Sequence, residues 1–246
     1  RAHGQTSRFP WDYGKTGEKT YLKYYWLREN LIEMLYSAAI SSNHRGLPMM
    51  KAMALAFPEE KDYLNNGEQY LFCDTILVAP VLEEKAQTKK VCFPKGTWYE
   101  LWSGNEVLGS CEREVPVSLK DCPAYLKSGI VLPVIMNEKM KWAVPFSEQN
   151  QTKVIVITPP NMDDEYRYYA EEDDKYVFKC VKEDERVFTI YSLKDIFINK
   201  LLIYGNVHEI EVDGKKEEFS IVYENQTMTA LRLKSDRWNK LTITCK

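Results

Sequence analysis

The sequence predicts a mixed α and β protein, with a helical first part and a β-rich remainder arranged as antiparallel sandwiches. Two observations lead to this prediction. Apolar residues recur at three- and four-residue steps before residue 69, and short apolar runs separated by turn residues follow residue 81. The stretch from residue 69 to 81 is therefore the border between two kinds of structure.

The border stretch reads Gln69-Tyr-Leu-Phe-Cys-Asp-Thr-Ile-Leu-Val-Ala-Pro-Val81. Its core, from Ile76 to Val81, is apolar, rich in β-branched residues and interrupted by Pro80. A run this short indicates a buried strand, because a membrane helix needs about 18 apolar residues.

The helical part is taken in order. Residues 1–17 are expected to form a loop, because glycine and proline interrupt any periodicity there. The apolar spacing over 18–45 predicts one long helix, with Gly46 as its stop. Residues 48–57 are then expected to form a strand, ended by Pro58.

After the border, turn signals recur every several residues, and apolar runs of strand length stand between them at 153–158, 187–191 and 200–204. Short strands at this spacing favour antiparallel sandwiches. We expect a first β domain over 83–137 and a second over 138–246.

Composition excludes some function classes. The 246 residues are 44% hydrophobic and 13% aromatic, which is ample for packed cores. The formal net charge of -3 provides no basic field, so nucleic acid is not an expected partner. No apolar run is long enough for a membrane span, and the first residues carry no apolar signal core.

The six cysteines are scattered without a CxxC pair, which argues against a zinc site and against a dense disulfide framework. We interpret them as buried or free thiols, a state that favours the cytoplasm without deciding the compartment. Two N-glycosylation triplets begin at Asn150 and Asn225, and they matter only on a secretory route.

Three patches, in this order and spacing, carry a family resemblance. They are the border stretch, Pro94-Lys-Gly-Thr-Trp-Tyr-Glu-Leu-Trp-Ser-Gly104 and Pro123-Ala-Tyr-Leu-Lys-Ser-Gly-Ile-Val-Leu-Pro133. They resemble the C-terminal part of glycoside hydrolase family 31, the family of α-glucosidases and α-xylosidases. Arg1-Ala-His3 followed by Pro10-Trp11 resembles a further family segment, at the rim of the catalytic pocket.

The resemblance implies a domain organisation. Residues 1–82 would be the last β/α units of a (β/α)8 barrel, 83–137 a proximal β-sandwich and 138–246 a distal one. A barrel needs about 250 residues in eight units, so 1–82 cannot close one alone. The resemblance therefore implies that an N-terminal part of the same enzyme is missing from this chain.

The resemblance also implies an activity: retaining, exo-acting hydrolysis, most simply of terminal α-linked glucose in an oligosaccharide or α-glucoside. This chemistry uses two carboxyl groups about 5–5.5 Å apart and no metal or organic cofactor. The family's two catalytic aspartates have no counterpart here, so we assign no catalytic residue and expect the chain alone to be inactive. The alternatives are an α-xylosidase and a non-catalytic carbohydrate-binding or scaffold protein.

The acidic segment 161–165 imitates the family's nucleophile segment in composition only. We interpret it as a solvated loop, with a surface calcium site as the alternative.

His3 and Arg1 are the candidate substrate-binding residues. An imidazole can donate a hydrogen bond to a sugar hydroxyl, and such bonds strengthen as an oxocarbenium ion develops. In the family the matching histidine contacts the sugar whose bond is cut, and the matching arginine orders the same rim. The alternative for His3 is an ordinary loop histidine.

Trp98, Tyr99 and Trp102 could form a sugar-stacking platform. Alternation along a strand places neighbouring side chains on opposite faces, so core packing is the better interpretation. Three departures from the family pattern are expected to affect packing more than chemistry: Glu33 for a helix-interior proline, Lys51-Ala52 for an Arg-Pro pair, and Cys73 for a glycine.

Overall fold

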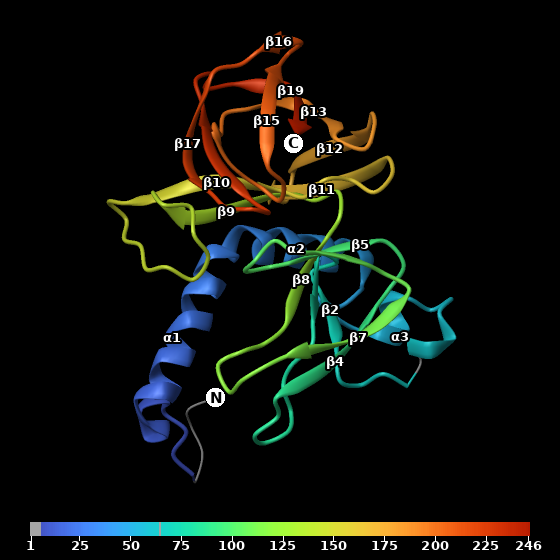
Figure 1. Ribbon diagram of the computed structural model, residues 1–246, viewed down its shortest axis with the longest axis vertical. Helices are drawn as coiled ribbons and strands as arrows, with labels where there is room; N and C mark the ends of the chain where they lie inside the picture. Colours follow the sequence, from blue (N-terminus) through green and yellow to red (C-terminus); the bar gives the residue numbers. More distant parts are fainter. Residues whose placement is uncertain (1–5, 64) are drawn as a thin grey trace.

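The computed structural model describes residues 6–63 and 65–246. Figure 1 shows the helical beginning of the chain beside and beneath a series of sheets. The described helices are η1 (Pro10–Tyr13), α1 (Gly14–Asn30), α2 (Ile32–Arg45), α3 (Met53–Ala56) and η2 (Lys61–Tyr63).

The long helix expected over 18–45 is two helices, because the backbone breaks at Leu31, which has φ -92° and ψ 8°. Helix α1 also begins at Gly14, inside the stretch expected to be a loop. The neighbouring Asn30 is fully buried: its Nδ2 donates to the Ile135 carbonyl at 2.7 Å, and its Oδ1 accepts from the Ala143 amide at 2.8 Å. These contacts anchor the break to the second half of the chain.

The end of α2 agrees with the sequence prediction. Gly46 adopts the left-handed conformation at φ 66°, and its amide donates to the Ser42 carbonyl at 2.8 Å. A glycine takes this conformation without the Cβ penalty, so it is a favourable helix stop.

The first sheet joins residues on both sides of the border stretch in the order β1-β2-β3-β8-β5-β6. Neighbouring strands in it pair antiparallel. Its strands are β1 (Met50–Ala52), β2 (Tyr70–Phe72), β3 (Ile76–Val78), β5 (Thr97–Glu100), β6 (Glu106–Leu108) and β8 (Ala124–Lys127). The strand expected over 48–57 is thus only β1, and α3 follows it.

This pairing corrects the barrel interpretation of residues 48–82. Barrel strands are parallel and need a crossover of a dozen or more residues, whereas β2 and β3 are joined by a short hairpin turn. Strands β1, β2 and β3 therefore belong to the antiparallel sheet that the following β segment completes. A separate ribbon, β4 (Thr88–Phe93) with β7 (Cys111–Pro116), covers this sheet's outer side.

The rest of the chain forms two further sheets. The second sheet has the order β17-β18-β14-β10-β9 and the third has β11-β12-β13-β19-β15-β16. The second sheet contains β9 (Val131–Asn137), β10 (Gln151–Ile157), β14 (Lys200–Ile203), β17 (Phe219–Glu224) and β18 (Thr229–Leu233). The third contains β11 (Asp164–Glu171), β12 (Asp174–Lys182), β13 (Val187–Ile196), β15 (Val207–Val212), β16 (Lys215–Lys216) and β19 (Trp238–Cys245). The three strand-like runs of the sequence fall in β10, β13 and β14, as predicted.

The second sheet is the middle layer of the molecule, because apolar residues line both its faces. In β10, Val154 and Val156 pack with the helices and the first sheet, in what we call the helix-side core. Ile155 and Ile157 pack with the third sheet, in what we call the upper core. Side chains alternate across a strand, so one continuous apolar run supplies two cores.

The first sheet divides its side chains in the same way. Trp98 is 1% exposed and packs on the outer side with the β4–β7 ribbon, whereas Tyr99 packs in the helix-side core. Trp102 is partly buried against the helix-side core. The core-packing interpretation of these three aromatics is therefore confirmed.

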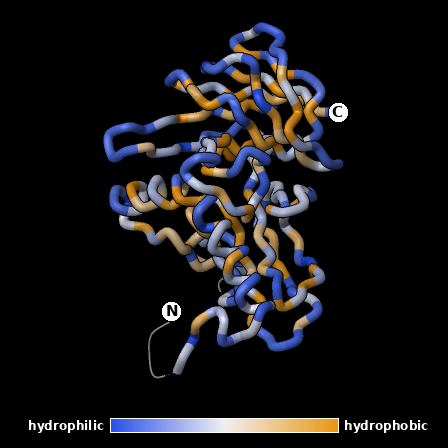
Figure 2. The backbone as a smooth tube through the Cα atoms, turned by 90° about the vertical axis from the view of Figure 1, so that its left-hand side faces the viewer, coloured by the Kyte–Doolittle hydropathy of each residue, from blue (hydrophilic) through white to orange (hydrophobic). Residues whose placement is uncertain are grey.

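The expected border between β domains, at Asn137, falls at the end of β9. All seven residues of β9 pair with β10, from Val131 opposite Ile157 to Asn137 opposite Gln151. The border thus separates two strands of one sheet. Figure 2 shows hydrophobic segments gathered inside the upper layers, with hydrophilic turns at their rim.

Replacing Leu201 by alanine tests the middle layer. Leu201 is fully buried in the upper core, so the change should lower the free energy of unfolding by about 2–5 kcal/mol. The matched control is Leu193→Ala, whose side chain is 83% exposed and whose loss should cost less than about 0.5 kcal/mol. Urea denaturation of both variants measures the difference, and equal losses would contradict the layer assignment.

Candidate functional site

The two substrate-binding candidates, Arg1 and His3, lie outside the described residues. The nearest described part of their motif is Pro10-Trp11, in η1. Trp11 is 63% exposed and stacks on Phe9, with ring centroids 4.7 Å apart. The rim segment therefore presents an aromatic face to solvent in this chain.

A cavity of about 330 Å³ lies where α2, the β2–β3 turn and the start of β11 meet; we call it the hairpin cavity. Residues far apart in the sequence line it, among them Arg45, Asp74, Lys127 and Asp164. Its size is at the lower end of small-molecule sites.

Asp74 is the centre of the polar contacts at this cavity. Cys73 and Asp74 form the β2–β3 turn, and both have positive φ, 52° and 57°. Two successive left-handed residues match a tight hairpin turn, for which glycine or asparagine is usual. This explains the family's glycine at the position of Cys73.

Asp74 holds two cations from separate elements. Arg45 Nη2, at the end of α2, lies 2.7 Å from Asp74 Oδ2, and Lys51 Nζ, on β1, donates to Oδ1. The side chain of Lys51 is only 8% exposed, so this charge is stabilised by its carboxylate partner. The two contacts tie α2 and β1 to the hairpin.

Burial by itself would raise the pKa of the Asp74 carboxyl. Hydrogen bonds and positive charges from Lys51 and Arg45 outweigh burial, and the pKa is lowered. Asp74 is therefore ionised at neutral pH and serves as an acceptor.

The opposite wall of the cavity carries the acidic segment. Asp164 pairs with Lys127 at 3.5 Å, and Glu165 pairs with Arg167 at 2.6 Å. Asp163 accepts from the backbone amide of Lys182 at 3.1 Å. Over residues 6–63 and 65–246, no group of histidine, cysteine, aspartate and glutamate side chains has the arrangement of a metal site.

Glu33 joins α2 to the sheets above it. Its Oε2 accepts from the Tyr168 hydroxyl at 2.5 Å, and its Oε1 lies 3.0 Å from Lys153 Nζ. Burial opposes ionisation, yet these two partners together lower the pKa of the Glu33 carboxyl. Glu33 stands in the first turn of α2, where a carboxylate and a proline are both favourable, so its place is a helix start and not a helix interior.

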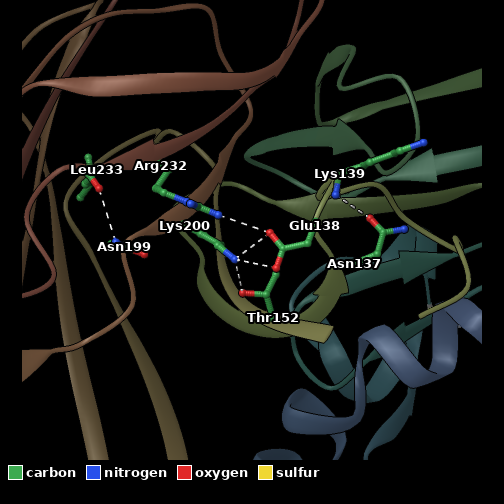
Figure 3. Close-up of polar contacts among 8 residues, drawn as sticks. All are labelled: Asn137, Glu138, Lys139, Thr152, Asn199, Lys200, Arg232 and Leu233. Carbon is green, nitrogen blue, oxygen red and sulfur yellow. Dashed lines mark hydrogen bonds and ion pairs between the residues drawn. The ribbon is translucent and has the colours of Figure 1, made fainter. Parts of the chain in front are cut away.

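A second charged cluster crosses the middle sheet (Figure 3). Lys200 Nζ donates to both oxygens of Glu138, at 3.2 and 3.1 Å, and to Thr152 Oγ1 at 2.7 Å. Arg232 approaches the same carboxylate at 3.3 Å. The cluster links strands β10, β14 and β18 to the residue that follows β9.

The two glycosylation triplets differ in structure. Asn225 Oδ1 accepts from the amides of Thr227 and Met228, both at 2.8 Å, and its Nδ2 donates to the Tyr223 hydroxyl at 2.8 Å. Asn150 is exposed and only its Oδ1 is engaged among the described contacts, by the Ser147 amide at 2.7 Å. A glycan is therefore sterically compatible with Asn150, whereas at Asn225 it would displace the turn.

All six cysteines lie within the described residues and are free thiols, as predicted. Burial is the largest influence on four of these thiols: it raises the pKa of Cys73 and Cys180 to about 12 and that of Cys92 and Cys245 to about 11. Such thiols are protonated near neutral pH and are poor nucleophiles.

Comparison with known proteins defines the class. Residues 46–132 match the glycosyl hydrolase family 31 C-terminal domain. The match begins directly after α2 and includes all strands of the first sheet. Residues 46–132 therefore match the C-terminal domain of glycoside hydrolase family 31, which confirms the resemblance seen in the three patches.

Curated relatives agree. The chain is 33% identical to an isomaltosyltransferase of Sporosarcina globispora over 135 residues, which is 53% of the chain and 12% of that protein. It is 31% identical to an alpha-xylosidase of Saccharolobus solfataricus over 137 residues, which is 55% of the chain and 19% of that protein. The matched segments thus span less than a fifth of these relatives.

Two solved enzyme structures share the fold. The cycloalternan-forming enzyme of Listeria monocytogenes superposes on 98% of this chain with a TM-score of 0.82 at 19% identity, over 25% of its own length. A family 31 dextranase of Flavobacterium johnsoniae covers the same share with a TM-score of 0.76 at 20% identity, over 34% of its own length.

The described helices include none with the length and apolar character to cross a membrane.

The ionised groups of the hairpin cavity are paired with one another, so they hold the surrounding elements in position. Sequence reasoning missed the Asp74 cluster, because Arg45, Lys51 and Asp74 meet only in the folded chain. The one available signal was Lys51, a departure from the family pattern.

Asp74→Asn should destabilise the fold by removing the carboxylate that neutralises buried Lys51. Breaking a fully buried pair costs about 3–5 kcal/mol, and because Asp74 is 39% exposed we expect about 1–2 kcal/mol at pH 7. The lowered pKa of Asp74 makes this contribution complete above the unfolded value of about 3.9 and lost as pH falls through the folded pKa.

The measurement is urea denaturation at pH 7 and at successively lower pH. The gap between the parent chain and Asp74→Asn should narrow below about pH 4. Asp173→Asn, in the exposed β11–β12 turn, is the matched control and should change stability little. A gap that is constant across this pH range would contradict an ionic role for Asp74.

Proposed function

We propose that this chain is the C-terminal portion of a retaining, exo-acting α-glycosidase that releases terminal α-linked glucose. The main support is the match of residues 46–132 to the family 31 C-terminal domain. The fold of a solved cycloalternan-forming enzyme, shared over 98% of the chain, agrees with it. One relative named above is an isomaltosyltransferase, the dextranase was solved with glucose, and the cycloalternan-forming enzyme was solved with a pentasaccharide substrate.

The catalytic carboxylates are supplied from outside this chain. A glycosidase acid needs a raised pKa. Among the described residues, every carboxyl group with a displaced pKa has it lowered: Glu33, Glu68, Asp74, Glu112 and Glu218. This supports the assignment of no described residue as the catalytic acid; Arg1 and His3 are proposed for substrate binding on the resemblance of their segment alone.

The organisation we propose has three parts, and the border between the first two lies at residue 46 and not at residue 83. Helices α1 and α2 complete the catalytic barrel, the domain around the first sheet starts at residue 46, and the second and third sheets form the distal part. The exposure of apolar side chains on one face of α1 supports this organisation: Tyr21, Leu22 and Tyr25 are 54%, 44% and 41% exposed. The upstream barrel would cover them.

α-Xylosidase activity is the second candidate, because an alpha-xylosidase is among the relatives at 31% identity. The two substrates differ by one hydroxymethyl group, which glucose carries at C5 and xylose lacks. We expect upstream residues to decide between them. Parallel assays of the full-length protein on aryl α-glucoside and aryl α-xyloside separate the candidates: preference for the xyloside would replace the glucosidase proposal.

The 246-residue chain by itself should not hydrolyse an aryl α-glucoside, since positioning without two carboxylates cannot replace covalent catalysis. The assay is release of the aryl group over hours against a full-length positive control. Turnover by the purified chain, abolished by replacing one of its own carboxylates, would refute the proposal that the catalytic carboxylates lie outside this chain.

His3→Ala in the full-length enzyme should lower kcat/KM for an α-glucoside by about 10² or more. A hydrogen bond strengthened in the transition state is worth a few kcal/mol, whereas a loop side chain costs folding about 1 kcal/mol or less. The matched control is His208→Ala, an exposed histidine on β15, which should leave kinetics unchanged. Near-normal kinetics with a lowered Tm would make His3 an ordinary loop residue.

A further inference from the structure

The described part of the rim segment, residues 6–13, is packed closely onto the start of α1. A Cβ added at Gly17 would stand 2.6 Å from Tyr13 Cβ and 3.3 Å from the Pro10 carbonyl oxygen, so glycine is required for this close approach. Asp12 Oδ2 also accepts from the Phe9 amide at 3.0 Å, which holds η1 at its first residue. The rim segment therefore moves with α1, and the direction of α1 decides where it lies.

The last turns of α1 are held by the second half of the chain. Asn30 bonds to two backbone groups there, and the rings of Trp26 and Phe146 have their centroids 5.2 Å apart. The first half of α1 has less support, because Tyr21 and Leu22 are exposed. Figure 1 shows α1 running from β9 to the end of the molecule opposite β16. The helix is thus a lever whose free end carries the rim segment.

Lys23 and Tyr24 make a contact halfway along α1, against the domain around the first sheet. The ammonium nitrogen of Lys23 lies 4.3 Å from the centre of the Trp102 ring, which is a cation–π distance, and it donates to the Lys120 carbonyl at 3.5 Å. The Tyr24 hydroxyl donates to the same carbonyl at 3.2 Å. Lys23, Tyr24 and Trp102 are half-buried, so water screens the contact only in part.

Trp102 is a fixed surface for this contact. It lies in the turn after β5, where Glu100 Oε2 accepts from the Trp102 amide at 3.1 Å and from the Ser103 amide at 2.5 Å. The neighbouring Leu101 carbonyl accepts from the buried hydroxyl of Tyr204, just after β14, at 2.6 Å. A side chain that meets Trp102 is therefore held against both the first and the second sheet.

The free part of the lever is long compared with the precision that a substrate site needs. From Lys23 to Gly14 the helix rises about 14 Å, at about 1.5 Å per residue. A change of about 10° in the direction of α1 would move the rim segment by about 2 Å, and a misplacement of about 1 Å can lower a catalytic rate about 100-fold.

We propose that Lys23 is a positioning residue, which sets the place of the rim segment through its cation–π contact with Trp102. Lys23 acts by holding α1 and not by touching substrate. The consequence for substrate rests on the proposed function, in which Arg1 and His3 belong to the same sequence segment. A contact of this kind changes an equilibrium about 2- to 30-fold, and this sets the size of the expected effect.

The first test is amide hydrogen exchange in the 246-residue chain. Lys23→Met keeps an unbranched stem and a similar helix propensity but removes the charge, whereas Lys23→Arg keeps the charge. We expect residues 18–22 to exchange about threefold to tenfold faster in Lys23→Met and at the parent rate in Lys23→Arg. Parent rates in Lys23→Met would overturn the proposal.

The matched control is Lys141→Met. Lys141 makes a similar cation–π contact away from α1, with its ammonium nitrogen 4.5 Å from the centre of the Tyr223 ring. Its replacement should leave the exchange of residues 18–22 unchanged. Equal acceleration in Lys141→Met and Lys23→Met would show a general loosening of the fold and would overturn the proposal.

The second test is a double-mutant cycle in the full-length enzyme. Lys23→Met and Trp102→Leu should each lower kcat/KM for an aryl α-glucoside about threefold to tenfold. The double variant should lose no more than Trp102→Leu alone, because no cation–π contact is left to break. Lys23→Arg and Lys141→Met should retain the parent kcat/KM. Two losses that multiply in the double variant would overturn the proposal, as would a Lys23→Arg variant that is as impaired as Lys23→Met.

The two tests separate this proposal from the proposed function. If Trp102→Leu is unfolded by circular dichroism, the comparison of Lys23→Met with Lys23→Arg decides the kinetic test. A full-length parent that hydrolyses neither the aryl α-glucoside nor the aryl α-xyloside would refute the proposed function. The exchange rates of residues 18–22 would then decide the role of Lys23 by themselves.

Discussion

The burial of the second sheet on both faces is the constraint on which the rest of this structure depends. Strands β10 and β14 place alternate residues in the helix-side core and in the upper core. The two cores share these strands, so each depends on the sheet that also builds the other. The helices and the first sheet are organised on one face and the third sheet on the other. The three larger sheets thereby form one stack of layers.

Polar contacts then fix how the helices meet that stack. Asn30 joins the end of α1 to β9, and Glu33 joins the start of α2 to Tyr168 on β11. Asp74 joins the end of α2 to the β2–β3 hairpin. Each contact replaces water around a buried or half-buried polar group with a protein partner, which gives orientation to helices that apolar packing alone would leave free to slide.

These contacts agree with a supporting role for the chain. Its displaced carboxyl groups are ionised and paired, its cysteine thiols are buried or half-buried, and α1 exposes an apolar face to solvent. A glycosidase acid needs a carboxyl group with a raised pKa, whereas every described carboxyl group with a displaced pKa has it lowered.

The sequence by itself determined the family, the β-rich second part, the strands at β10, β13 and β14, the stop at Gly46 and the burial of Trp98. Local apolar spacing and turn residues encode these features directly. Only the tertiary structure decided the break at Leu31, the antiparallel pairing of β1, β2 and β3, and the meeting of Arg45, Lys51 and Asp74. Periodicity tells which face of an element is buried but not which element covers it, and a single-residue break or an ion pair between distant residues leaves no periodic signal.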